Sequence, residues 1–230
     1  MSFFNIQEPI LRRKQTHLDV QDLKGLLSWR WQIKQRTIIS WLYTRIDQVF
    51  LLWGWIVGLI FLTPQVFPAI SWVDQAIWWS VLSVAGAGGM AGLAWFWVTV
   101  ERLRWLIYLW CELVVGGVAL TDYGIFASSG IILANLCALW LAICAVGYGA
   151  MGLGMRSRTF LAIAGLHIAA IPLLDMVPAH QFLVTAMVMS GSLFALAELQ
   201  WDMRRPSESK QLSTAQNAFN LKQQHLRALS

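Results

Sequence analysis

The feature that most constrains this chain is the separation of its basic residues from its apolar runs. All 17 Lys and Arg residues lie in segments that flank long apolar runs. Each run approaches the roughly 20 apolar residues that a helix needs to cross the hydrocarbon core of a bilayer. Charged residues make up only 13% of the chain, which is too few to cover the exterior of a water-soluble domain. The sequence therefore predicts an all-α integral membrane protein.

Six apolar runs are long enough to count as candidate spans. We predict a six-transmembrane-helix bundle over residues 46–200, preceded by a basic N-terminal segment (1–45) and followed by a polar C-terminal tail (201–230). Because polar residues dominate residues 206–230, we expect a short, loosely held helix or disorder there. The predicted spans are Ile46–Phe67, Gln75–Val100, Trp105–Leu120, Ser129–Gly154, Thr159–Met176 and Gln181–Leu199.

The segments between the spans alternate in charge. Eight basic residues precede the first span, two follow the second, two follow the fourth and five follow the sixth, whereas the other three loops have none. Basic loops near span ends are retained on the cytoplasmic side of a membrane. We therefore expect both termini to be cytoplasmic, in a bacterial inner membrane or an equivalent organellar membrane. Positive charge confined to span flanks also argues against nucleic acid as a partner.

The N-terminal segment contains an amphipathic pattern. Leu23, Leu26 and Leu27 recur at helical spacing, and Trp31 continues the apolar stripe. This pattern predicts an amphipathic cytoplasmic helix that lies on the membrane interface, or alternatively a helix packed beneath the bundle. Its basic side chains would bind anionic lipid or a partner protein. They are Lys24, Arg30, Lys34 and Arg36.

Small residues four positions apart mark candidate contacts between spans. Helices in lipid associate where small side chains let their backbones approach closely. Gly54 and Gly58 form such a pair in the first span, and Gly88 and Gly92 form another in the second. We predict that both pairs are helix-packing positions.

Two ionisable residues and one amide lie within the predicted spans. Glu112 lies eight residues beyond Arg104 and His167 nine beyond Arg158, which puts both about 12–14 Å along their helices. Intramembrane ionisable groups are costly, so each is a functional candidate. If their spans adjoin, Glu112 and His167 would form a hydrogen-bonded pair that relays a proton; alternatively they only satisfy each other, or each bonds a backbone carbonyl. Asn135 is a third polar candidate, nearer the outer face.

Four tryptophans lie deep in the predicted spans. Such side chains fill a helix bundle, or they face lipid or a bound apolar pigment or quinone. Bundle filling is the interpretation that the sequence favours, and no particular cofactor is indicated. The four residues are Trp53, Trp55, Trp110 and Trp140.

The loops without basic residues each contain one acid, namely Asp74, Asp122 and Asp175, and His180 lies beside the last. A cation-binding mouth is one interpretation of this arrangement. Turn capping is the favoured one, because metal sites need ligands at closer and more specific spacing. We therefore predict no metal site.

Three functional classes remain open. A non-catalytic membrane component that anchors or assembles other membrane proteins, or its own copies, fits the few charges in the spans and the glycine contacts. A small transporter or channel subunit would use Glu112, His167 and Asn135 along a path. An enzyme ranks last, because no catalytic motif is found. We expect the lipid bilayer itself to be a partner in every case.

Overall fold

The computed structural model describes residues 3–6, 9–15, 17–33, 36–204 and 209–229 and is dominated by helices. Five helices are long and apolar enough to cross a membrane, if the last is counted from the short 3-10 turn η1 (Pro178–His180) that precedes it. A sixth apolar helix, α7, is shorter, with 17 residues. The helices of the bundle are α2 (Arg45–Val66), α3 (Trp72–Val100), α4 (Arg104–Phe126), α6 (Leu136–Met155), α7 (Arg158–Leu174) and α8 (Gln181–Glu198).

The predicted fourth span, Ser129–Gly154, is not one helix. It is divided at Asn135 into the one-turn helix α5 (Gly130–Ala134) and the long helix α6. The Asn135 side chain donates a hydrogen bond to the carbonyl of Ile131, one turn back, at 2.8 Å. Asparagine competes for backbone groups in this way, which explains why the helix is interrupted there.

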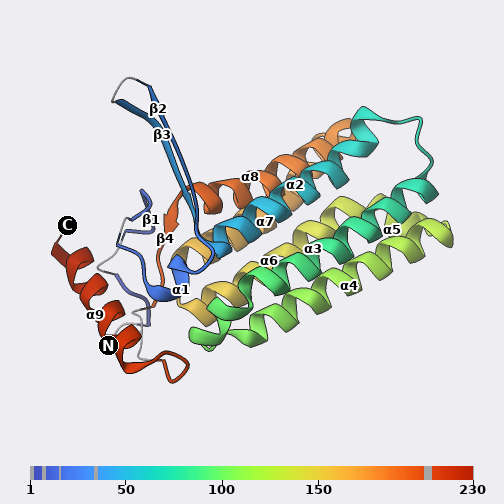
Figure 1. The fold of residues 1–230 in the computed structure, drawn as a ribbon. Helices are drawn as coiled ribbons and strands as arrows, with labels where there is room; N and C mark the ends of the chain where they lie inside the picture. The colour runs from blue at the N-terminus through green and yellow to red at the C-terminus, as the bar shows by residue number, and fades with distance from the viewer. Residues whose placement is uncertain (1–2, 7–8, 16, 34–35, 205–208, 230) are drawn as a thin grey trace.

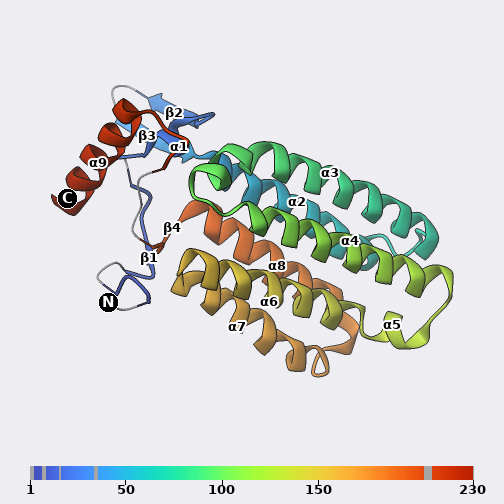
Figure 2. The same ribbon diagram turned by 90° about the horizontal axis from the view of Figure 1, so that it is seen from below.

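Five helices form a closed ring, and the sixth lies outside it. Around the ring, α2 packs on α3, α3 on α4, α4 on α6, α6 on α8 and α8 on α2, while α7 packs on α6 and α8. Figures 1 and 2 show the helices running side by side in alternating directions. Both chain termini lie at the same end of the bundle, which we call the terminal end.

Two connections at the terminal end share one backbone geometry. Arg102, two residues after the end of α3, and Arg156, directly after α6, have φ angles of 57° and 54°, in the left-handed region. The amide of the following residue then donates to a carbonyl five residues back, from Leu103 to Val98 at 2.7 Å and from Ser157 to Gly152 at 2.8 Å. This bond is characteristic of the Schellman motif, which reverses the chain within a few residues.

The glycine pairs differ in what they contact. A Cβ at Gly54 would lie 2.7 Å from the ring of Phe194, and one at Gly58 would lie 3.2 Å from the hydroxyl of Ser190, so this pair packs closely against α8. The predicted pair in α3 behaves otherwise, because a Cβ at Gly88 or Gly92 would meet nothing within 4 Å in the described chain. Gly88 and Gly92 therefore do not pack helices of this chain together.

The two terminal segments pack on each other and form what we call the cap. It contains β1 (Leu11–Arg12) paired antiparallel with β4 (Gln200–Trp201), the short helix α1 (Val20–Leu23), and the C-terminal helix α9 (Thr214–Leu229). Asn220 accepts a hydrogen bond from the amide of Val20 at 2.8 Å, and Arg227 donates to both oxygens of Asp19 at 3.0 and 3.1 Å. The tail thus forms a helix of 16 residues that is held by specific contacts, rather than the short, loosely held helix or the disorder that the sequence led us to expect.

Asp202 joins the cap to the bundle. Its side chain is 1% exposed and accepts hydrogen bonds from the backbone amides of Arg158 and Thr159, at 3.1 and 3.0 Å. The hydroxyls of Ser157 and Thr159 and the guanidinium of Arg158 also donate to it. Asp202 therefore caps the N-terminus of α7, where amide groups lack partners within the helix.

The prediction of an amphipathic N-terminal helix is wrong. Among the described residues before α2, only α1 is helical, and Gly25, with a φ of 74°, follows it. The chain then forms an antiparallel hairpin of β2 (Leu27–Ile33) and β3 (Arg36–Tyr43), which extends away from the bundle in Figure 1. Aromatic and β-branched residues are frequent in this stretch and favour strands. Lys34, one of the predicted basic side chains, lies outside the described residues.

Candidate functional site

The structure does not bring Glu112 and His167 together. His167 is completely buried on α7, where its Nδ1 lies 2.9 Å from the carbonyl oxygen of Ile163 and its ring lies against Tyr148. Glu112 lies on the exposed side of α4, and α4 packs on α3 and α6 rather than closely on α7. Within the described ranges, Glu112 has no hydrogen bond or ion pair. The relay hypothesis thus lacks its central contact.

Asp74, Asp122 and Asp175 lie within or directly after helices rather than in loops. Ser71 caps α3 by accepting from the amide of Asp74, and its hydroxyl donates to the Asp74 carboxylate at 2.6 Å. Asp122 accepts from Ser80 at 2.9 Å, which ties α4 to α3, and Asp175 is the C-terminal cap residue of α7. Among the residues that the structure describes, no three His, Cys, Asp or Glu side chains are grouped as metal ligands.

The outer face of α3 and α4 combines small residues with the Glu112 carboxylate. Trp95 of α3 and Tyr108 of α4 pair on this face, with ring centroids 6.3 Å apart. Gly92 lies eight residues from the end of α3, and Glu112 lies eight residues from the start of α4, so both lie about 12 Å from the terminal end. By the same count, Gly88 and Gly116 both lie about 18 Å from the terminal end. We call Gly88, Gly92, Glu112 and Gly116 the glycine–glutamate face.

An elongated cavity of about 110 Å³ lies inside the ring. It is lined by apolar and aromatic side chains of α2, α3, α4, α6 and α8 and by Trp201, and among the described residues no charged side chain lines it. Trp53, Trp110 and Trp140 are part of this lining, whereas Trp55 is two-thirds exposed on the outside. An empty cavity costs about 24 cal/mol per Å³, so this one would cost about 3 kcal/mol if unfilled.

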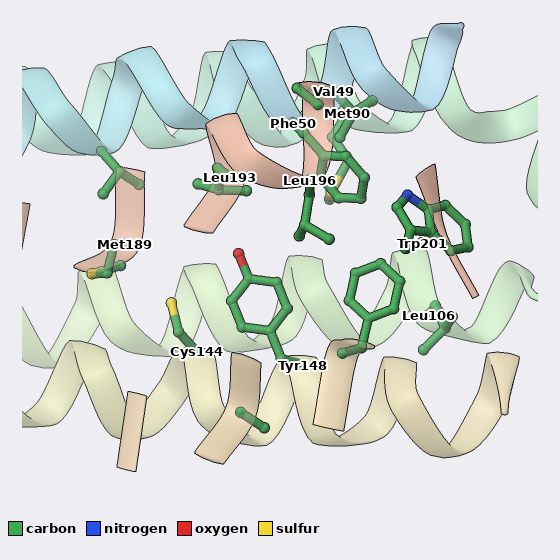
Figure 3. Packing of buried hydrophobic residues seen from close by; sticks show 14 of the residues in the cluster. Val49, Phe50, Met90, Leu106, Cys144, Tyr148, Met189, Leu193, Leu196 and Trp201 are labelled. Atoms are coloured by element: carbon green, nitrogen blue, oxygen red, sulfur yellow. The ribbon is translucent and has the colours of Figure 1, made fainter. Parts of the chain in front are cut away.

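Tyr148 places a polar atom inside this apolar cavity. The side chain is 3% exposed, and Figure 3 shows its hydroxyl pointing from α6 toward Leu193 of α8 across the interior. No described residue forms a hydrogen bond with this hydroxyl. A water molecule in a buried site needs two to four polar partners, and this cavity offers little besides the hydroxyl. The interior therefore accommodates an apolar group better than a water molecule.

A second, polar pocket of about 100 Å³ adjoins the cavity at the terminal end. Ile46, Trp97 and Trp201 line both spaces, so the two meet at these residues. The polar pocket lies between the cap and the bundle, and it is lined by four carboxylates and three guanidinium groups. These are Asp19, Asp22, Asp47, Glu101, Arg12, Arg204 and Arg227.

Three of the four carboxylates have a cationic partner. Asp19 pairs with Arg227 at 3.0 Å, Asp47 with Lys14 at 2.8 Å, and Glu101 with Arg204 at 4.0 Å. Glu101 also accepts from Gln21 at 3.0 Å. Burial raises the pKa of Asp19 and of Glu101, against the opposing effect of their arginine partners.

Asp22 differs from the other three, because no basic side chain pairs with it in the described part of the chain. Its carboxylate accepts a hydrogen bond from the indole of Trp97 at 3.0 Å. Burial, together with the nearby carboxylates of Asp19 and Glu101, raises the pKa of Asp22 to about 7 despite that bond. The Asp22 carboxyl, with its raised pKa, lies at the boundary between the polar pocket and the apolar cavity, beside Trp97.

Little in the sequence predicted the apolar cavity or the polar pocket. The carboxylates come from residues 19–22, 47 and 101, and they converge only because the cap folds over the end of the ring. The tryptophans were identified from their depth, but the cavity between them depends on which helices adjoin. No protein-family model matches this chain, and neither the curated proteins nor the solved structures contain a match to it.

Proposed function

We propose that this chain is a non-catalytic component of a membrane protein assembly, and that it binds a transmembrane helix of another protein on its glycine–glutamate face. It would cross the membrane six times, with both termini in the cytoplasm of a bacterial cell or on the equivalent side of an organelle. The observation that carries the proposal is the unpaired Glu112 carboxylate on the outer surface of α4, at the depth of the hydrocarbon core.

The six-span arrangement is supported by the alternation of the helices. Because α2, α3, α4, α6, α7 and α8 alternate in direction, the Arg-containing turns and both terminal segments fall at one end. At 1.5 Å per residue, the 17 residues of α7 extend about 25 Å, which approaches the roughly 30 Å thickness of the hydrocarbon core. The positive-inside rule then assigns the terminal end to the cytoplasm.

Glu112 is the reason to expect a protein partner. Apolar side chains on the outside of a membrane protein need no explanation, because lipid tails solvate them. A carboxylate at this depth is costly unless a neighbouring protein supplies a hydrogen-bond donor or an opposite charge. Gly88, Gly92 and Gly116 flank it and leave room for a helix backbone to approach.

Charge complementarity favours a different protein over a second copy of this chain. The partner helix should carry a Lys or Arg at the depth of Glu112. In this chain, no Lys or Arg lies beyond the first residue of any of the six bundle helices. A symmetric dimer on this face would instead place two carboxylates together.

The transporter or channel alternative has less support. A path for ions or polar solutes needs polar groups along the interior, and the interior cavity is lined by apolar and aromatic side chains. Glu112 faces outward, and Asn135 is exposed, at the start of α6.

The test is quantitative co-purification of tagged variants from native membranes in a mild detergent. Removal of one partner from a desolvated ion pair costs about 3–5 kcal/mol, so Glu112→Gln should reduce recovery of the partner at least about tenfold. Gly88→Leu should do the same by filling the face.

Gly165→Leu is the matched control, because Gly165 of α7 is also an exposed glycine with open space around it. This variant should retain the partner. Equal recovery with all three variants would refute the proposed face. Recovery of only further copies of this chain would refute the choice of a different protein as the partner.

A further inference from the structure

The interior cavity and the polar pocket together have the form of a site for an amphiphile. Residues that line the cavity extend along α2 from Ile46 to Val57, eleven residues or about 16 Å. At about 110 Å³, the cavity is smaller than the ~150 Å³ apolar cavity that holds one benzene ring. A small volume over such a length describes a narrow space that excludes a flat ring system. A single hydrocarbon chain enters it when the flexible side chains that line it, such as Met90, Met151 and Met189, move apart.

The end of this narrow space determines what kind of head group fits. At the terminal end the cavity meets the polar pocket at Trp97 and Trp201, whose rings lie 6.3 Å apart at 71°. Aromatic faces of this kind attract cations. Beyond them lies Asp22, the acid of the pocket that has no basic partner in the described chain, while Asp19, Asp47 and Glu101 are already paired. The three guanidinium groups and Lys14 balance the four carboxylates overall, so what the pocket offers a cationic head group is the local environment of the Asp22 carboxyl.

We propose that the chain binds a single-chain amphiphile with a cationic head group, whose hydrocarbon chain fills the interior cavity and whose head lies in the polar pocket beside Asp22. This site is separate from the glycine–glutamate face and does not depend on the proposed assembly function. The hydrocarbon chain replaces empty space among the tryptophans. The buried hydroxyl of Tyr148 then faces the ligand rather than a void.

Photolabelling of the full-length protein in phosphatidylcholine nanodiscs tests this proposal. The probes are three saturated amphiphiles of equal chain length that carry a diazirine on the last carbon and differ only in the head group, which is trimethylammonium, sulfate or hydroxyl. Peptide mapping then identifies the labelled side chains. With the trimethylammonium probe, we expect label on cavity residues such as Val57 and Met189, at the end of the cavity far from the cap.

Two variants and one control separate site binding from labelling by the surrounding bilayer. Leu193→Trp puts a large side chain into the cavity and should abolish cavity labelling by all three probes. Val146→Trp, on the exposed side of α6, should leave it unchanged. Asp22→Asn should weaken cavity labelling by the trimethylammonium probe about tenfold, which corresponds to about 1.4 kcal/mol, and should not change labelling by the hydroxyl probe.

Two results would overturn the proposal. Label confined to exposed side chains such as Val146 would show that the cavity admits no chain. Cavity labelling by the sulfate probe equal to that by the trimethylammonium probe, or insensitive to Asp22→Asn, would refute the cationic head group.

Discussion

Replacement of Asp22 by Asn should change how the stability of the cap depends on pH. The pKa of Asp22 is raised from 3.8 in the unfolded chain to about 7 in the folded one, so the folded state holds more protons between these values. Stability therefore falls as pH rises from about 4 to about 7, and it levels off above that range. A rise of the pKa from 3.8 to about 7 corresponds to at most roughly 4 kcal/mol, and the effect is smaller because the side chain is only partly buried.

The assay is amide hydrogen exchange of α1 and α9 as a function of pH, corrected for intrinsic exchange rates. In the parent chain, the free energy of opening of these helices should fall by about 2–4 kcal/mol between about pH 4 and pH 8. In Asp22→Asn, which is uncharged at every pH but still accepts from Trp97, this decrease should shrink by most of that amount. Buried Asp19 and Glu101 contribute to the slope of both proteins, so the difference reports Asp22 together with its coupling to these two carboxylates. Identical slopes in the two proteins would refute the reasoning.

Two further predictions concern the packing of the bundle and its cap. Asp202→Ala removes the buried carboxylate that caps α7 and pairs with Arg158. The free energy of unfolding, measured by thermal unfolding in detergent, should fall by about 3–5 kcal/mol. An unchanged transition would contradict the capping role. Gly54→Val would place a Cβ 2.7 Å from the ring of Phe194 and should lower the free energy of unfolding by about 1–3 kcal/mol. Gly165→Val, where there is open space, should have a much smaller effect. Equal unfolding transitions for the two variants would contradict the packing assignment.

Much of the bundle could be predicted from the sequence, because lipid imposes a simple requirement on a spanning helix. Runs of apolar residues with basic flanks predicted the starts of the helices at Arg45, Arg104 and Arg158 to within one residue, whereas α4 continues to Phe126, six residues beyond the predicted end at Leu120. The interruption at Asn135 was not predicted, since the apolar run continues through it and only the side-chain bond to Ile131 reveals the break.

The hairpin was missed although its signal was present. From Leu27 to Ile33, apolar and polar residues alternate strictly, which is the pattern of a strand. The helical spacing of Leu23, Leu26 and Leu27, continued by Trp31, outweighed it in the prediction, although Trp29 interrupts the polar face of such a helix. A period of two that continued over seven residues was the stronger pattern.

The candidate sites could be predicted only in part, because they depend on which helices adjoin. Equal depth correctly identified Glu112 and His167 as residues within helices, but depth does not specify the order of helices around a ring. Asp22 has no distinctive local pattern. Its burial depends on the folded cap, in which α1 contacts α9 through Val20 and Asn220, 200 positions apart in the chain.

The most direct test of the proposed function is site-specific photocrosslinking in living cells from position 116, one turn beyond Glu112 on the glycine–glutamate face. Our account predicts a crosslink to a transmembrane helix of a different protein with a Lys or Arg at matching depth. That crosslink should disappear in the Glu112→Gln background and should not form from position 165 on α7. Crosslinks to lipid alone, or equally strong crosslinks to the same protein from both positions, would contradict the account.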